Sequence, residues 1–242
     1  AVRALARTPA ALPKQAGVEA VQGDLTDPAA LAALCEGAEG VLHIAGAISG
    51  GAAHMQRVNA EGTATLLAAA GKAGVKRFVH VSSLAAREPE LSPYARSKAA
   101  GEAAVRAATR TLSTLIIRPP AVYGEGDRAT LPLLRALTSR TALLPGLKQS
   151  RFSLIHAEDL ARICIASLEC PVSGVREVDD GHGAYTWPDV AGILQQMCGR
   201  PQRLHFLPLM VATAVGHAAD GLAALTGKPG MVSAGKIREL YH

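Results

Sequence analysis

Short apolar runs alternate with segments rich in alanine and leucine through the first half of the chain. Several of the apolar runs are nearly continuous, which is typical of strands buried on both faces of a sheet. The segments between them are long enough to form helices that cover such a sheet. The predicted strands are 1–7, 17–22, 40–45, 78–81 and 112–117, and the predicted helices are 29–35, 54–73 and 94–110. The sequence therefore predicts an α/β fold with a doubly wound parallel sheet.

Beyond Gly126 this regular alternation ends and helical segments predominate. The expected elements there are helices at 130–139, 158–168, 188–198, 208–225 and 233–240, with strands at 151–155 and 175–178. We therefore predict two parts. Residues 1–124 form most of the sheet, and residues 125–242 form a smaller, mostly helical part from which some elements return to the sheet.

The amino-acid composition excludes several classes of protein for this chain. Of 242 residues, 49% are apolar and 19% are charged, so the chain can bury a full core and is too apolar to be disordered. The net charge of +5 is small and the basic residues are scattered, so nucleic acid is not an expected partner. The sequence shows no signal-peptide pattern, no apolar run long enough for a membrane span and no paired cysteines. We expect a cytoplasmic protein without a membrane partner or a metal site.

A hydroxyl pair, a tyrosine and a lysine follow the apolar run at 78–81. The run ends in Ser82-Ser83, Tyr94 comes eleven residues after Ser83, and Lys98 comes four residues after Tyr94. Positions i and i+4 of a helix lie on the same face, so a helix here points the phenol and the ammonium the same way. A nearby cation favours the phenolate and lowers the phenol pKa from its usual value of about 10. The spacing therefore predicts a site for proton transfer.

In this order and context, these residues resemble the extended short-chain dehydrogenase/reductase family, which includes NAD(P)-dependent epimerases and dehydratases. The resemblance implies a Rossmann-type fold with Ser83, Tyr94 and Lys98 as the catalytic triad. Ser83 is preferred to Ser82 because the family's catalytic hydroxyl is the last of its cluster. The chain is most similar to the branch of dihydroflavonol reductases and hydroxysteroid dehydrogenases.

Other segments of the chain also resemble motifs of this family and imply cofactor contacts. Residues 23–27 resemble the motif whose Asp-Leu contacts the adenine, and residues 43–46 resemble the strand exit beside the pyrophosphate and nicotinamide ribose. Residues 118–124 resemble the R-P-x-x-V-Y-G element beside the nicotinamide. Together with Tyr94 and Lys98, the implied cofactor-binding residues are Asp24, Leu25, Ala45, Gly46, Pro119 and Val122.

The choice of cofactor depends on the end of the first predicted strand. NAD-binding proteins of this fold place a carboxylate there, whereas an arginine accommodates the 2′-phosphate of NADP. This position holds Ala6 and Arg7, and the similar reductases use an Arg and a Lys at the spacing of Arg7 and Lys14. We therefore expect NADP as the cofactor, with NAD as the alternative.

The resemblance implies an NADP-dependent oxidoreductase that transfers a hydride between nicotinamide and a carbonyl compound or secondary alcohol. Residues 1–124 would bind the dinucleotide and residues 125–242 the substrate. A sugar-nucleotide epimerase of the same family and a non-catalytic NADP-binding protein stay open as alternatives, as does a homodimer. A hydrophobic or aromatic substrate is favoured by a group of leucines expected along its pocket, Leu84, Leu131, Leu133 and Leu134.

One departure from the family concerns the glycine-rich turn, G-x-x-G-x-x-G, that follows the first strand of its members. The sequence before Arg7 holds no such turn, so we expect the strand at 1–7 to be the family's second. We also expect roughly 25–35 further residues to precede it, by the size of a βαβ unit, and we expect residues 1–242 alone to bind the cofactor poorly without that turn. In this fold the first strand lies in the middle of the sheet, in the order 3-2-1-4-5-6. The strands at 1–7 and 40–45 are therefore expected not to pair.

Overall fold

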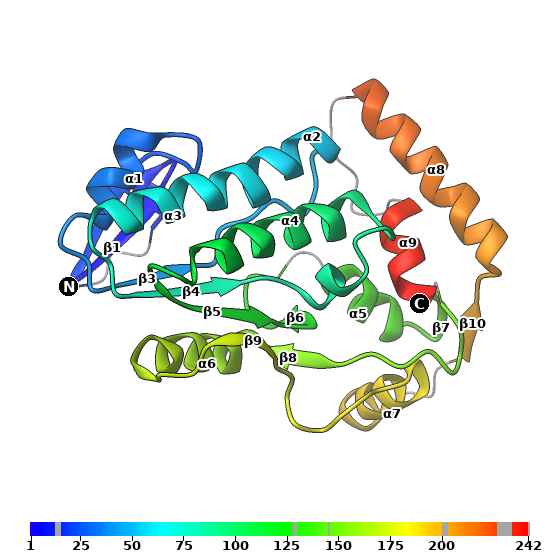
Figure 1. Ribbon diagram of the computed structural model, residues 1–242. Coiled ribbons are helices and arrows are strands. Elements are labelled where there is room, and N and C mark those ends of the chain that lie inside the picture. The colour runs from blue at the N-terminus through cyan, green and yellow to red at the C-terminus, as the bar shows by residue number, and fades with distance from the viewer. Residues whose placement is uncertain (13–15, 128–129, 145, 200–202, 227–233, 242) are drawn as a thin grey trace.

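The structure is a computed structural model and describes residues 1–12, 16–127, 130–144, 146–199, 203–226 and 234–241. Figure 1 shows parallel strands with helices on both sides of them, and further helices gathered beyond one end of the sheet. The chain therefore has the α/β architecture that the alternation of strands and helices predicts.

The main sheet has four parallel strands in the order β3-β4-β5-β9. Their bounds are Gly40–His43 for β3, Arg77–Val81 for β4, Ser113–Arg118 for β5 and Gly174–Glu177 for β9. Phe78 of β4 pairs with Val41 on one side and with Thr114 on the other, so β4 is a central strand. All its residues are buried, as expected for a strand covered on both faces.

The first two strands form a parallel pair of their own. β1 (Val2–Ala6) pairs with β2 (Val18–Gln22), and a short 3₁₀ turn, η1 (Pro9–Ala11), follows β1. Among the described residues, β1 and β3 belong to different sheets and share no ladder. The prediction that the strands at 1–7 and 40–45 do not pair is therefore confirmed for the described residues.

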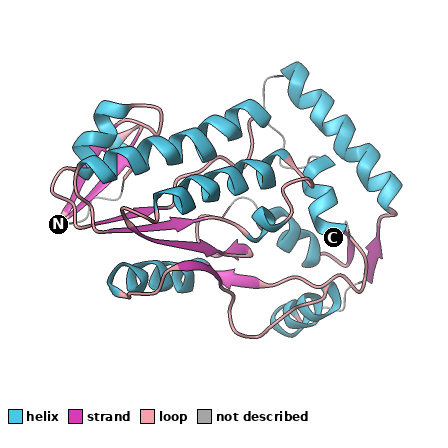
Figure 2. Ribbon diagram, in the orientation of Figure 1, coloured by secondary structure: helices cyan, strands magenta, loops and turns pink. Residues whose placement is uncertain are grey.

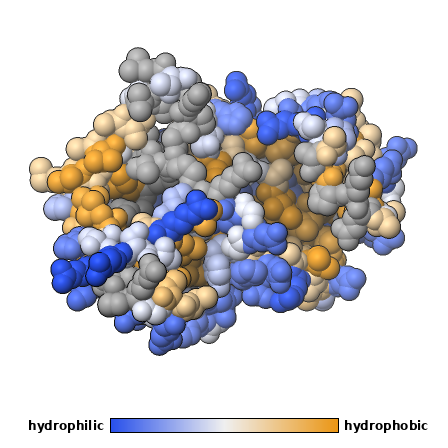
Figure 3. All heavy atoms as spheres, turned by 180° about the vertical axis from the view of Figure 1, so that it is seen from behind, coloured by the Kyte–Doolittle hydropathy of each residue, from blue (hydrophilic) through white to orange (hydrophobic). Residues whose placement is uncertain are grey.

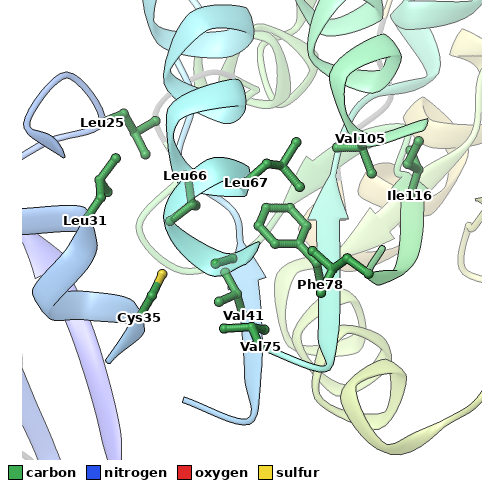
Figure 4. Packing of buried hydrophobic residues seen from close by; sticks show 12 residues of the cluster. Leu25, Leu31, Cys35, Val41, Leu66, Leu67, Val75, Phe78, Val105 and Ile116 are labelled. Carbon is green, nitrogen blue, oxygen red and sulfur yellow. The ribbon is translucent and has the colours of Figure 1, made fainter. Parts of the chain in front are cut away.

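The larger core lies between the main sheet and the helices α1 (Pro28–Cys35), α3 (Gly62–Lys72) and α4 (Pro93–Ala108). Its central side chain is Phe78, which is fully buried. Figure 4 shows the Phe78 ring close to Leu67 of α3. Burying a side chain of this size stabilises a fold by about 1.5–3 kcal/mol.

The opposite face of the sheet packs against α6 (Ala157–Glu169). Val79, the neighbour of Phe78 on β4, belongs to this second cluster together with Cys164 of α6. Neighbouring residues of a strand point to opposite faces, so these two positions locate the two helical layers. Figure 2 shows the helices of both layers on either side of the strands.

The predicted helix at 54–73 is part of a longer, composite helical segment. It begins as α2 (Ala52–Met55), continues as the π-helical turn η2 (Gln56–Glu61) and ends as α3. The N–H of Gly62 donates to the carbonyl of Arg57, five residues earlier, which is the π-helical pattern. The apolar periodicity of the sequence does not reveal this turn.

The close approach of α4 to η2 depends on Gly101. A Cβ at this position would lie 2.4 Å from Asn59 O, a backbone atom that cannot turn away. We therefore expect Gly101→Ala to lower the free energy of unfolding by about 1–3 kcal/mol, the usual cost of overpacking. Urea unfolding measures this change.

Gly71→Ala on α3 is the matched control, because a Cβ there meets nothing within 4 Å. Alanine has the better helix propensity, so this variant should be as stable as the wild type or more stable by up to about 1 kcal/mol. Equal behaviour of the two variants would show that the contact between Gly101 and Asn59 does not limit the packing.

A second, smaller core joins elements that lie outside the main sheet. Its buried members include Leu137, Leu144 and Trp187, and Leu133 and Leu134 pack against it. The elements that contribute are α5 (Leu131–Leu137), β7 (Thr141–Leu144), α7 (Trp187–Cys198) and β10 (Arg203–Phe206).

Three short strands in this region were not predicted, namely β6 (Ala121–Tyr123), β7 and β10. β7 pairs with β10, and β6 pairs with β8 (Leu154–His156). The predicted strand at 151–155 corresponds to β8, preceded by an isolated bridge between Phe152 and Tyr185. Strands of three or four residues carry little sequence signal, because pairing with a distant segment is what forms them.

The two C-terminal helices, α8 (Leu209–Thr226) and α9 (Ala234–Tyr241), pack against each other. A Cβ at Gly216 of α8 would lie 2.8 Å from Ala234 Cα, so the glycine permits this approach. Figure 3 shows apolar surface exposed among polar surface in the view from behind. Across the described ranges, none of the helices combines the length and the apolar character needed to cross a bilayer. Among the described side chains of α8, the exposed large apolar residues are Leu209, Met210, Val211 and Val215.

Candidate active site

The helix that carries Tyr94 and Lys98 begins where local signals place it. Pro93 occupies the first turn of α4, and the Oγ of Ser92 accepts a hydrogen bond from Ala95 N at 2.9 Å. Both features favour a helix start, so the beginning of α4 could be predicted from sequence. Tyr94 and Lys98, four residues apart, lie on one face of this helix.

The two serines at the end of β4 have different partners. Ser82 is buried, and its Oγ donates to Glu102 Oε1 at 2.7 Å. Ser83 caps the 3₁₀ turn η3 (Leu84–Arg87), where its Oγ accepts from the backbone of the turn at 3.2 Å. Ser83 is also close enough to the phenol of Tyr94 for its hydroxyl to lower the pKa of that phenol. Of the pair, Ser83 is therefore the serine that meets Tyr94.

The pKa of the Tyr94 phenol is raised rather than lowered. Burial raises this pKa, the hydrogen bond from Ser83 lowers it, and the charge of Glu239 raises it again. The prediction of a lowered Tyr94 pKa is therefore wrong for this structure, because burial is the largest influence on the phenol. Tyr94 keeps its proton at neutral pH, as a proton donor requires.

Lys98 lies against the end of the central strand. Its side chain is buried, and its Nζ donates to Val81 O at 2.8 Å. Burial lowers the pKa of Lys98 from 10.5 to about 8, although the Glu102 carboxylate opposes this shift. The ammonium is thereby held by the backbone immediately before Ser82 and Ser83.

Glu102, which was not among the predicted site residues, is a carboxylate buried one turn beyond Lys98. Arg118 binds its two oxygens at 2.8 and 2.7 Å, and Arg106 binds one of them at 2.9 Å. Burial raises the pKa of Glu102, but hydrogen bonds from Arg118 and Ser82 and the charges of both arginines outweigh burial and lower it. The one sequence signal for this residue was its i+4 spacing from Lys98.

This charged network joins the segments that form the site. Glu102 links α4 to β4 through Ser82 and to the end of β5 through Arg118. Arg118 also approaches Glu177 of β9 at 3.5 Å, and Arg87 of η3 binds Glu177 at 2.7 Å. The turn after Ser83 and the helix with Tyr94 are therefore fixed to the same set of strand ends.

Asn59, in the π-helical turn η2, holds the loop that follows β3. Its Nδ2 donates to Ala47 O at 2.8 Å and to Ser97 Oγ at 2.9 Å, and its Oδ1 accepts from Ala47 N at 2.7 Å. Ser97 lies on α4 between Tyr94 and Lys98. The side chain of Asn59 thus fixes the distance between this loop and the catalytic candidates on α4.

Two buried histidines lie near Lys98, one on β3 and one on β4. The rings of His43 and His80 are 5.0 Å apart, and His43 Nε2 forms a 2.9 Å hydrogen bond with Thr63 Oγ1. Burial lowers the pKa of both, with a further contribution from the charge of Lys98, so that the pKa of His43 is about 3. Both rings are neutral at neutral pH, and Lys98 is the charged group among the three.

The loop after β3 presents small, exposed residues beside Lys98. β3 ends at His43, two residues before the predicted end, so Ala45 and Gly46 lie in this loop. A Cβ at Gly46 would lie 3.0 Å from Asn59 Oδ1 and 3.8 Å from Lys98 Nζ. The backbone is therefore open to a bound molecule where a larger side chain would crowd it, as a closely approaching dinucleotide needs.

The residues predicted to contact adenine and phosphate lie at the carboxyl ends of β1 and β2. Hydrogen bonds from Thr26 lower the pKa of the exposed Asp24, and the charge of Arg7, exposed just after β1, lowers it further. The side chain of Leu25 is buried in the larger core, which leaves its backbone for such a contact. Lys14 lies outside the described residues.

The residues predicted beside the nicotinamide follow β5. Pro119 is buried, and its carbonyl accepts from Leu84 N at 3.0 Å, so it lies next to the turn after Ser83. Val122 lies on β6 and pairs with Ile155 of β8. Because β3, β4 and β5 are parallel, the residues after them share one edge of the sheet, which is where ligands bind in open α/β sheets.

Comparison with known proteins assigns the chain to a family. The model of the NAD dependent epimerase/dehydratase family matches residues 1–179. The chain belongs to this family. The resemblance that the Ser-Tyr-Lys motifs indicated is therefore confirmed, and with it the Rossmann-type fold of an NAD-dependent class of enzymes.

Relatives within the epimerase/dehydratase family include reductases and dehydrogenases. A ceramide reductase of Caulobacter vibrioides is 45% identical over 228 residues, which cover 93% of this chain and 71% of that protein. A 3 beta-hydroxysteroid dehydrogenase/Delta 5→4-isomerase of Mycobacterium tuberculosis is 32% identical over 188 residues, 66% of this chain and 51% of the relative. The chain thus spans about half the length of the steroid dehydrogenase.

Solved structures of this epimerase/dehydratase type share the fold. A short-chain dehydrogenase/reductase superfamily protein from Agrobacterium tumefaciens with bound NAD superimposes with a TM-score of 0.72 and 24% identity, over 85% of this chain and 78% of that one. A dTDP-glucose 4,6-dehydratase from Streptomyces venezuelae with bound NAD has a TM-score of 0.67 and 26% identity, over 80% of this chain and 68% of that one.

Proposed function

We propose that the protein is an NADP-dependent oxidoreductase that transfers a hydride between nicotinamide and a carbonyl compound or secondary alcohol. The observation that carries this proposal is the group at the end of β4: the hydroxyl of Ser83 acts on the phenol of Tyr94, and Lys98 lies one turn further along the same helix face. The names of the two sequence relatives, a reductase and a dehydrogenase, support oxidation and reduction as the chemistry.

Each member of the group has its own role in the proposed reaction. NADP, when bound, supplies or accepts the hydride. Tyr94 gives its phenolic proton to the carbonyl oxygen during reduction, and Ser83 orients that oxygen with its hydroxyl. Lys98 binds the nicotinamide ribose from its place beside Gly46. The raised pKa of Tyr94 keeps the phenol protonated, which favours the direction of reduction.

The residues that would hold the cofactor are distributed along the carboxyl edge of the strands. The exposed Arg7 would bind the 2′-phosphate, and the small residues after β3 would let the backbone approach the pyrophosphate. The full proposed set is Arg7, Lys14, Asp24, Leu25, Ala45, Gly46, Tyr94, Lys98, Pro119 and Val122.

We infer that the substrate is a carbonyl compound with a large hydrocarbon part. Ceramides and steroids, which name the two relatives, share this character. Of the leucines expected along the pocket, Leu133 and Leu134 pack into the second core instead. Leu84 in η3, directly after Ser83, and the partly exposed Leu131 at the start of α5 are the ones that stay outside the core clusters.

A substrate panel tests the proposal. The full-length protein, with the residues expected before Ala1, is mixed with NADPH and with a long-chain ketone, a keto steroid or UDP-glucose. We expect consumption of NADPH with one of the apolar ketones and formation of an equal amount of alcohol. Epimerisation of UDP-glucose without net consumption of cofactor would identify the epimerase instead, and a UDP-glucose 4-epimerase of Vibrio cholerae is 30% identical to this chain over 152 residues. NADPH binding without turnover would identify a binding protein.

Arg7→Ala is expected to abolish a preference for NADPH over NADH. A hydrogen bond to a charged group contributes about 1.5–3 kcal/mol, so the Kd for NADPH should rise roughly tenfold to a hundredfold while the Kd for NADH changes little. Fluorescence titration measures both constants. Arg110→Ala, exposed after α4, controls for the loss of a positive charge. Equal affinities for the two cofactors in the unmutated protein would contradict the assignment of Arg7.

A further inference from the structure

Helix α9 lies against the first turn of α4, just before Tyr94. Figure 1 shows α9 beside the end of α4 at which that helix begins. The contact is close, because a Cβ at Gly235 would lie 2.9 Å from Ser92 Cβ. Ala234 and Ile237 on the same helix are buried. α9 is therefore docked on the cap of the helix that carries the proton-transfer candidate.

The side chain of Ser92 connects the two helices. Ser92 is buried, and its Oγ accepts from Ala95 N as the N-cap of α4. The same hydroxyl donates to Oε1 of Glu239 on α9. A carboxylate thereby lies at the N-terminal end of α4, where a negative charge is favourable. Its charge also acts on the phenol of Tyr94.

We propose that Glu239 is a positioning residue for proton transfer by Tyr94: its hydrogen bond with Ser92 fixes α9 to the cap of α4 and holds a carboxylate at the N-terminal end of the helix that carries the phenol. This inference rests on the proposed function, in which Tyr94 exchanges a proton with the substrate oxygen. It depends neither on the identity of the substrate nor on the choice between NADP and NAD.

Three charged side chains on the surrounding elements have partners of their own among the described residues. Lys98 of α4 donates to Val81 O, and Arg87 of η3 binds Glu177 at 2.7 Å. Arg238 of α9 donates at 3.4 Å to a carbonyl of its own helix. Among the described residues, Glu239 is the charged group that acts on the phenol of Tyr94.

The direction of the effect follows from electrostatics. A carboxylate next to a phenol disfavours the phenolate, so Glu239 raises the pKa of Tyr94 and keeps the proton available for reduction. In oxidation, Tyr94 must first lose its proton, and the rate rises with pH up to the pKa of Tyr94. Without the charge, oxidation at a given pH below that pKa should be faster, by about three- to tenfold.

The experiment compares Glu239→Gln, Glu239→Asp and the wild type in the full chain. Glutamine keeps an oxygen that can accept from Ser92 and removes the charge, whereas aspartate keeps the charge. For each protein, the pH dependence of alcohol oxidation with NADP is measured. The phenol of Tyr94 is also titrated by NMR on protein with isotope-labelled tyrosine, and Tyr94→Phe assigns its signal. Glu169→Gln, exposed at the end of α6, controls for loss of a carboxylate elsewhere.

We expect Glu239→Gln to move both the Tyr94 titration and the oxidation profile to lower pH, and Glu239→Asp to behave like the wild type. An unchanged Tyr94 titration in Glu239→Gln would overturn this inference and leave the proposed function standing. Absence of Tyr94-dependent turnover in the wild type would overturn the proposed function, and the NMR titration would still decide whether Glu239 acts on the phenol.

Discussion

Tyr94→Phe is expected to lower kcat by about 10²–10⁴ and to leave the Kd for NADPH nearly unchanged. The phenol is the group that exchanges the proton in the proposed reaction, and phenylalanine removes only its hydroxyl. The half-buried ring keeps its packing on α4, so Ser83 and Lys98 should stay in place. Steady-state kinetics and a fluorescence titration with NADPH measure the two quantities separately.

Tyr185→Phe is the matched control for this variant. The hydroxyl of Tyr185 binds Asp180 Oδ2 at 2.6 Å and its side chain packs against the second core, so loss of this hydroxyl should leave kcat unchanged. A Tyr94 variant that keeps most of its kcat would show that another group supplies the proton. A variant that loses NADPH binding as well would assign the hydroxyl to cofactor binding.

Glu102→Gln is expected to lower the free energy of unfolding by about 3–5 kcal/mol, because it removes one partner of a buried ion pair. Arg118 would keep its charge in the same place, facing an amide that cannot neutralise it. The net stability of a domain is about 5–15 kcal/mol, so the loss is a large fraction of the total. Urea unfolding at neutral pH measures the difference.

Glu158→Gln is the matched control, since Glu158 forms an ion pair with Arg162 in which both side chains are largely exposed. Exposed pairs contribute about 0–1 kcal/mol, so this variant should unfold like the wild type. Equal losses of unfolding free energy in Glu102→Gln and Glu158→Gln would show that the buried ion pair stabilises the fold no more than the exposed one.

The contribution of Glu102 should also depend on pH in a defined direction. Its pKa in the folded protein is lowered from 4.5, so the stabilisation is fully present above pH 4.5 and is lost as pH falls through the lowered value. The difference in stability between the wild type and Glu102→Gln should therefore shrink in acid. A difference that stays constant down to the acid transition would show that the carboxylate is not stabilised by its arginines.

The parts of the site that could be predicted from sequence are those set by local signals. The strand before Ser82 is a short run of mostly apolar residues, and Ser92 and Pro93 mark the start of α4. Ser83 could therefore be placed at the end of a strand, and Tyr94 and Lys98 on a helix. These signals act over a few residues, and the structure follows them closely.

The parts that could not be predicted arise from contacts between distant segments. Glu239 and Ser92 are 147 positions apart, and Arg118 reaches Glu102 from another element. No local pattern encodes such pairs. The direction of the Tyr94 pKa also depends on burial, which is a property of the packed molecule.

The π-helical turn η2 also sets the phase of the helix that contains it. An α-helix rotates by about 100° per residue, and the extra residue in a π turn offsets the segments before and after it by about that angle. Asn59 within the turn faces the loop after β3, while Leu66 and Leu67 beyond it face the core. Deleting one residue from 56–61 would restore a regular helix and rotate one of these two faces out of register. Both the loop beside Lys98 and the packing of Phe78 therefore constrain the length of this turn, and a one-residue deletion there would not be neutral.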